Sequence, residues 1–204
     1  GLIQTSLRHD GLTIQGATMD AAAIRAELDH PVIDADGHII EFIPAIRDLI
    51  AADAGTALAD TFQAMSTAGA TARRGLTDDQ RRANGMSRTG WWAVPTRNTL
   101  DRATAMLPRL LYNRLDEIGI DVAVLYPTVG LTVMATDNPE LRRALARACN
   151  RYYAEAYDKY SDRLLPVGVI PTYDPDEAIA ELEYATKELG LRGFLFGGLV
   201  LRNA

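Results

Sequence analysis

The sequence predicts an α/β protein built on a parallel sheet, and two observations lead to this fold class. Four apolar runs lack the polar alternation of a half-exposed sheet, as strands buried on both faces require; they are residues 31–38, 120–128, 164–170 and 193–196. Helical patterns with capping residues separate the later runs. Because strand–helix–strand units cross over with a right hand, this order fits either a doubly wound sheet or a (β/α) barrel.

The chain ahead of the first strand is expected to be a lead-in with one short helix. An alanine-rich stretch over residues 20–28 has a helical pattern that must end before Pro31, because the residue before a proline avoids the helical conformation. We therefore divide the chain into a lead-in over 1–30 and a main unit over 31–204.

Two later helices begin with the same sequence device. Asn138 and Asp174 each precede a proline, so that a capping side chain is followed by proline at the first helical position. Gly190 is placed to end the second helix. The apolar faces behind these caps are Leu141, Leu145, Ala148 and Tyr152 in the first helix, and Ala178, Leu182, Ala185 and Leu189 in the second.

The segment 43–119 is too long for an ordinary connection between neighbouring strands. It contains a helical pattern over 43–52, a polar region over 67–88 that we expect to be mobile, and a strong helix over 99–115. We interpret it as an insertion after the first strand, which would serve as a lid or as a docking region.

Composition excludes several classes of protein. The chain has 204 residues with a formal net charge of −6, and this acidic balance argues against nucleic-acid binding, which needs a clustered basic face. Its one cysteine, Cys149, excludes an intrachain disulfide framework and is expected to fill space in the core. No apolar run is long enough to cross a membrane. We expect a cytosolic protein.

Asp34, Asp36 and His38 stand at alternate positions where the first strand ends. In regular strand geometry their side chains would point to the same side, where a carboxylate and an imidazole can close on a divalent metal ion. Gly37 would let the backbone turn toward that ion. The alternative is that the two aspartates cap the following turn and that His38 is a hydrogen-bonded loop residue.

The first strand resembles the opening strand of the amidohydrolase-2 family, which includes the aminocarboxymuconate semialdehyde and hydroxybenzoate decarboxylases. The resemblance rests first on Val-Ile-Asp-Ala-Asp-Gly-His-Ile-Ile-Glu over residues 32–41. Further pieces match in the same order, namely Asp101-Arg102-Ala103-Thr104, residues 115–121, residues 126–130 and Pro171-Thr172. The resemblance implies a TIM (β/α)8-type barrel with a divalent metal at the carboxyl ends of its strands.

The resemblance also implies which residues bind the metal. Asp36 and His38 occupy the positions where the wider family has a His-x-His or Glu-x-His pair, with Asp36 replacing the usual first ligand. Asp34 would orient the turn. A carboxylate with one imidazole suits zinc, manganese and iron equally well, so we expect one or two divalent ions of these kinds.

Three further residues are candidate contacts around the metal or the substrate. Glu41 follows His38 by three residues and would support the site or touch the substrate; the alternative is a solvated acid at a helix start. Trp92, beside Trp91, could line a pocket for a flat ring or seal an interface. Thr128 ends a strand at the catalytic face, where its hydroxyl could contact the substrate or merely cap a turn.

Arg102 is a candidate for binding a substrate carboxylate, because a guanidinium can bind both carboxylate oxygens at once. The alternative is an ion pair within the protein, with Asp101 or Asp116 as partner. We favour the ion pair.

The pattern contains only about four β/α units, whereas a whole barrel needs eight. The further ligands implied by the resemblance, a histidine after the fifth strand and an aspartate after the eighth, have no counterparts, because His38 is the last histidine of the chain. Half a barrel would expose strand edges and an apolar sheet face. We therefore expect a second polypeptide that supplies the remaining strands, or self-association.

The function expected on this basis is that of a metal-dependent hydrolase or lyase, active only with the missing half. The reaction would be hydrolysis, which we favour, or nonoxidative decarboxylation of a small organic acid or ring substrate. The alternative is a non-catalytic half-barrel that stabilises or regulates a catalytic partner.

Overall fold

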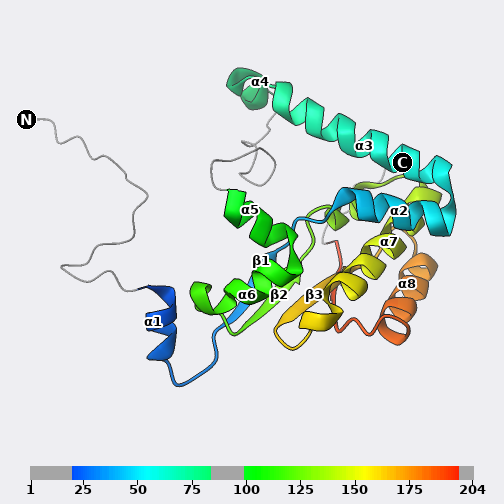
Figure 1. The fold of residues 1–204 in the computed structure, drawn as a ribbon. Helices are drawn as coiled ribbons and strands as arrows, with labels where there is room; N and C mark the ends of the chain where they lie inside the picture. Colours follow the sequence, from blue (N-terminus) through cyan, green and yellow to red (C-terminus); the bar gives the residue numbers. More distant parts are fainter. Residues whose placement is uncertain (1–19, 84–98, 198–204) are drawn as a thin grey trace, which may run out of the picture.

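The computed structural model describes residues 20–83 and 99–197 of the chain. Within them a sheet of four parallel strands forms the centre of the protein (Figure 1). The strands are β1 (Ile33–His38), β2 (Val122–Tyr126), β3 (Leu164–Val169) and β4 (Gly193–Leu195). Each strand pairs with the next in sequence, so the sheet lacks the reversal of strand order found in a doubly wound fold and has the order of consecutive barrel strands.

Helices occupy the connections between the strands (Figure 1). Before β1 lies α1 (Ala21–Ala26), and between β1 and β2 lie α2 (Ile43–Ala54), α3 (Thr56–Gly75), α4 (Asp78–Ala83), α5 (Thr99–Met106) and α6 (Pro108–Ile118). The short turns η2 (Gly130–Ala135) and η3 (Asp158–Tyr160) flank α7 (Pro139–Tyr157), and α8 (Pro175–Lys187) connects β3 to β4.

The predicted caps of α7 and α8 are confirmed. The side chain of Asn138 accepts hydrogen bonds from the amides of Glu140 and Leu141 at the start of α7. Asp174 accepts from the amides of Asp176 and Glu177 at the start of α8. These bonds satisfy amide groups that a helix leaves without a partner in its first turn.

The prediction for the segment between β1 and β2 is partly wrong. Residues 67–75 belong to α3, which runs for 20 residues, and residues 78–83 form α4, so this part is helical. The predicted helix over 99–115 is divided into α5 and α6 at Leu107, whose backbone is extended. Pro108 causes the break, because its ring excludes the helical conformation of the preceding residue.

The sheet has one buried face and one open face. Ala123, Leu125 and Leu164 point to the helix-covered face and are buried. On the opposite face, which we call the inner face, Val122 and Val124 of β2 are only half-buried and Ile33 of β1 is 58% exposed. Strand pairing places Ile33 beside Val122. The inner face corresponds to the interior of a closed barrel, where side chains from all strands meet.

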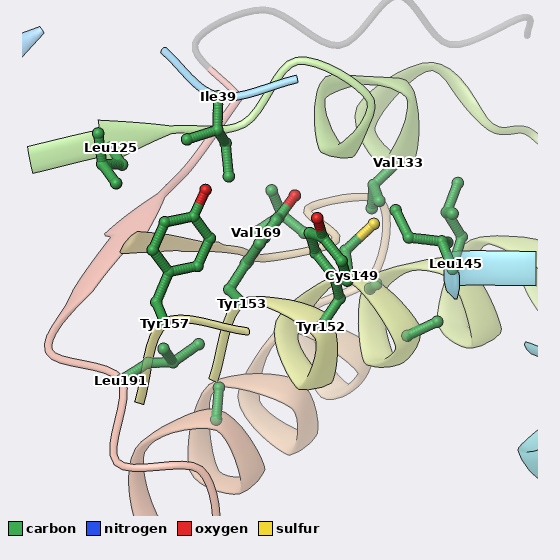
Figure 2. Close-up of a cluster of buried hydrophobic side chains, with 14 of the residues drawn as sticks. Ile39, Leu125, Val133, Leu145, Cys149, Tyr152, Tyr153, Tyr157, Val169 and Leu191 are labelled. Carbon is green, nitrogen blue, oxygen red and sulfur yellow. The ribbon is translucent and has the colours of Figure 1, made fainter. Parts of the chain in front are cut away.

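Helix α7 provides much of the core on the helix-covered side (Figure 2). The side chains of Leu145, Cys149 and Tyr153 are fully buried there among residues from the other elements. Cys149 is buried filler, as the sequence predicts, and burial raises the pKa of its thiol well above the ordinary value.

No helix in the described part of the chain combines the length and apolar character needed to cross a membrane.

Candidate metal centre

The candidate metal ligands lie on β1, whose pairing with β2 contains an irregularity. Asp34 pairs with Ala123 and Gly37 with Leu125, so two residues of β1, Ala35 and Asp36, stand opposite a single residue of β2. Such a β-bulge inserts one residue into a strand and shifts the alternation of side chains that follow it. The ligand motif therefore does not have regular strand geometry.

The bulge separates Asp34 from the other two candidates, and the expectation that all three side chains share one side is wrong. The Oδ2 atom of Asp34 lies within 3.1 Å of the place where a Cβ of Gly37 would stand, as does the side chain of Leu125. Asp34 and Leu125 thus lie on the helix-covered side. A cavity of about 270 Å³ there is lined by Asp34 and Gly37, by Ala123 and Leu125, by α5 and α6 residues, and also by His38.

His38 is brought to the inner face beside Tyr126. The two residues are strand partners, and their ring centroids lie 6.0 Å apart with the planes tilted by 38°. Tyr126 is half-buried and His38 is exposed, as is Asp36 two residues earlier. Alternation from Gly37 places Asp36 on the inner face with His38. The carboxylate and the imidazole thus share the carboxyl edge of the sheet, where active sites of parallel barrels lie.

The side chain of Asp34 is hydrogen-bonded to the backbone of the bulge. Its Oδ1 atom accepts a hydrogen bond of 3.0 Å from the backbone amide of Asp36. This bond from a side chain to the backbone two residues on stabilises the bulge. Asp34 therefore shapes the backbone that carries Asp36.

The donor set fits a divalent cation in part. A carboxylate oxygen and an imidazole nitrogen suit manganese, zinc or iron, but a protein site uses three or more such ligands. Among residues 20–83 and 99–197, no group of three or more His, Cys, Asp or Glu side chains is gathered to hold a metal. Asp36 and His38 could thus provide two ligands of such a site.

Glu41 is neither solvated nor placed to meet a substrate. Its side chain is 2% exposed, and its carboxylate accepts hydrogen bonds from the amides of Thr128, Val129 and Gly130 at 2.8–3.2 Å. The hydroxyl of Tyr153 donates to the same carboxylate at 2.7 Å. Glu41 therefore fastens the start of α2 to the loop that follows β2.

Gly130 has no room for a side chain in this arrangement. A Cβ there would meet the Tyr153 hydroxyl and would lie 2.8 Å from Cβ of Pro127. We expect Gly130→Ala to lower the free energy of unfolding by about 1–3 kcal/mol through overcrowding, measured by urea denaturation. Tyr153→Phe in the same chain should restore part of the loss. Gly75→Ala, at a position with open space, is the control, and an equal loss there would contradict the explanation.

The remaining candidates are placed as follows. The backbone amide of Thr128, rather than its hydroxyl, makes the contact with Glu41. Arg102 lies half-buried on α5; its neighbour Asp101 pairs with Arg114, while Asp116 pairs with Arg163. Trp92 lies outside the described residues.

The sequence pattern gave no sign of a second buried polar cluster at the end of β3. Asn150 is 0% exposed; its amide group donates to the carbonyl of Val169 at 2.9 Å and to Glu181 at 2.8 Å, and it accepts from the amide of Val169 at 2.8 Å. Arg147 also donates to Glu181, at 2.9 Å. This cluster joins α7, β3 and α8. No sequence motif marks a buried asparagine on a helix, so its role is seen only from its contacts in the structure.

Comparison with solved structures supports the partial-barrel fold. The crystal structure of 5-carboxyvanillate decarboxylase from Novosphingobium aromaticivorans with manganese and 3-methoxy-4-hydroxy-5-nitrobenzoic acid matches with a TM-score of 0.55 and 21% identity, over 86% of this chain and 44% of that one. A second structure of that decarboxylase, also with manganese, matches with 20% identity and the same TM-score. The 2,6-dihydroxybenzoate decarboxylase from Rhizobium matches with a TM-score of 0.47 and 20% identity, over 85% of this chain and 40% of that one.

The chain spans less than half the length of these solved structures. The likeness to the first two shows a shared fold, that of part of a TIM barrel. A search of curated proteins gives no match. The sequence model of the amidohydrolase family, however, matches residues 33–201, which include the whole sheet. The chain therefore belongs to the amidohydrolase family, as the resemblance of its first strand implies.

Proposed function

We propose that this chain is the metal-holding portion of a metal-dependent enzyme of the amidohydrolase family. The observation that carries the proposal is the position of His38 opposite Tyr126 at the carboxyl edge of β1, with Asp36 two residues before it, within the region that the family model matches. The side chain of Asp34 lies on the other face, where it accepts a hydrogen bond from the backbone amide of Asp36. A divalent ion, when bound, would polarise a substrate oxygen or lower the pKa of a bound water.

We propose a small aromatic carboxylic acid as the substrate and nonoxidative decarboxylation as the reaction. The support is twofold: the fold neighbours with a TM-score of 0.55 are decarboxylases of such an acid with manganese bound, and Tyr126 offers a half-buried ring beside His38 against which a flat substrate can pack. The bond between the ring carbon and the carboxylate breaks, carbon dioxide leaves, and the ring carbon takes up a proton. Hydrolysis, favoured by the sequence alone, becomes the competing outcome of the test.

We propose that a second polypeptide completes the barrel. The inner face is open along β1 and β2, where Ile33 is 58% exposed and Val122 and Val124 are half-buried. In the described sheet, β1 and β4 are the outer strands. Four further β/α units pairing with these strands would cover the inner face and bring the missing ligands to Asp36 and His38.

The test is to isolate the native complex through a tag on this chain and to determine its mass and metal content. The complex is then offered hydroxybenzoates and, separately, ester and amide substrates, before and after chelation. We expect a stoichiometric second chain, bound divalent metal, and carbon dioxide release that stops on chelation and returns with Mn²⁺. Hydrolysis without carbon dioxide release would contradict the decarboxylation, and a complex that binds no metal would identify a non-catalytic half-barrel instead.

A further inference from the structure

A buried carboxylate, that of Glu41, connects the end of β1 to the loop after β2. We infer that Glu41 is a positioning residue that holds His38 in place against Tyr126 at the carboxyl edge of the sheet. This inference deepens the proposed function, because it concerns the support of the same site. It replaces both interpretations that the sequence allowed, the substrate contact and the solvated acid.

The geometry around Glu41 excludes direct contact with a substrate. One carboxylate oxygen, Oε1, accepts from the amide of Gly130 at 2.9 Å and from the Tyr153 hydroxyl at 2.7 Å. The other, Oε2, accepts from the amide of Val129 at 2.8 Å, and the amide of Thr128 lies 3.2 Å from both oxygens. With 2% exposure the side chain has no free surface toward a ligand.

The donors form a closed set around a negative charge. Successive backbone amides that converge on one point make a concave binding site for an anion, and a carboxylate strengthens each bond to them. Burial raises the pKa of Tyr153 well above its ordinary value, so its hydroxyl remains a donor. A neutral amide at residue 41 would place an NH2 donor where a carboxylate oxygen now accepts from backbone N–H groups.

The Glu41 carboxylate and its hydrogen-bond donors are connected to His38 in two ways. In sequence, Glu41 follows His38 by three residues, and Ile39 between them donates its amide to the carbonyl of Tyr126 at 3.0 Å. In space, the loop that Glu41 holds begins two residues after Tyr126. His38 and Tyr126 are therefore fixed on one side by their strand pairing and on the other by the carboxylate. Without the carboxylate, the segment after Ile39 and the loop at residues 128–130 would lose these hydrogen bonds between them.

The test compares Glu41→Gln with Glu181→Gln in the full chain. Glu181 is the matched control, because it is also a buried carboxylate with hydrogen bonds from other side chains, yet it joins α8 to α7. Histidine ring signals suit the measurement by NMR, since the chain has three histidines. The first readout is the His38 ring shift without metal, which depends on the nearby Tyr126 ring. The second is the Mn²⁺ concentration that half-broadens the His38 signal.

We expect Glu41→Gln to shift the His38 ring signal, to speed amide exchange at residues 128–130 about tenfold, and to raise the half-broadening Mn²⁺ concentration about tenfold. Glu181→Gln should leave all three unchanged. Tyr153→Phe removes one hydrogen bond to Glu41 and should change the same three quantities in the same direction by smaller amounts. It replaces Glu41→Gln in the test if that variant does not fold.

Faster amide exchange at residues 128–130 together with an unchanged His38 ring shift would overturn the inference. Glu41 would then be a purely structural residue. If Mn²⁺ does not broaden the His38 signal of the unchanged chain in the native complex, the proposed metal site fails, whereas the metal-free ring shift still decides the positioning role. Equal effects of Glu41→Gln and Glu181→Gln on the His38 signal would also overturn the inference, since they would reflect general loosening.

Discussion

Replacing His38 by alanine is expected to weaken Mn²⁺ binding by the native complex at least about 100-fold and to abolish carbon dioxide release. Loss of groups that only support a metal ligand already costs about 10–100-fold in affinity, and His38 would be a ligand itself. Isothermal titration with Mn²⁺ and metal analysis of the purified complex measure the effect. His30→Ala is the control, because His30 is an exposed histidine before β1 whose ring lies within hydrogen-bond distance of the backbone carbonyl of Pro31.

A pair of aspartate variants tests whether the bulge turns the side chains of Asp34 and Asp36 to opposite faces of the sheet. Asp36→Asn should reduce Mn²⁺ affinity about as strongly as the histidine variant, because an amide is a poorer ligand for a hard cation. Asp34→Asn should have a much smaller effect, since the Asp34 side chain lies on the helix-covered face. An equal loss in both variants would show that Asp34 is a ligand and that the bulge does not divide the motif.

Asn150→Ala is expected to lower the free energy of unfolding by about 3 kcal/mol. The change removes three hydrogen bonds and leaves both backbone groups of Val169 and the Glu181 carboxylate without this partner inside the protein. Each buried group left unsatisfied costs about 1–3 kcal/mol, and for a chain of this size about 3 kcal/mol lowers the Tm by roughly 6–12 °C. Urea denaturation and calorimetry measure the loss.

Asn113→Ala is the matched control for this prediction. Asn113 also lies on a helix, α6, but it is exposed, and surface substitutions of this kind usually change stability by less than about 0.5 kcal/mol. A loss in Asn113→Ala similar to that in Asn150→Ala would show that the α7 network carries no special share of the stability.

The sequence predicted the elements whose signals are local. The four strands appear close to their expected bounds, and the caps at Asn138 and Asp174 make the expected bonds. Residues 67–83 were misjudged because their polar composition hid the end of one helix, α3, and a second short helix, α4. Polar residues populate exposed helices as readily as loops, so composition alone does not separate the two.

The candidate site was predictable in its chemistry and in part of its geometry. The motif around Asp36 and His38 identified the family, and it marked the strand end where the structure has these candidate residues. The bulge was not predictable, because it depends on how β1 pairs with a strand more than eighty residues later. Regular alternation was therefore the natural assumption, and it misplaced Asp34.

The sequence by itself determined the family, the order of the strands, and the two residues proposed to bind a metal. These follow from short-range signals: apolar runs, caps, and a motif within ten consecutive residues. The tertiary structure decided which side chains share the inner face. It also showed that Glu41 and Asn150 are buried and hydrogen-bonded to residues of other elements. The physical reason is that a buried polar group is defined by distant partners: Glu41 meets amides 87–89 residues away, and no local pattern records that meeting.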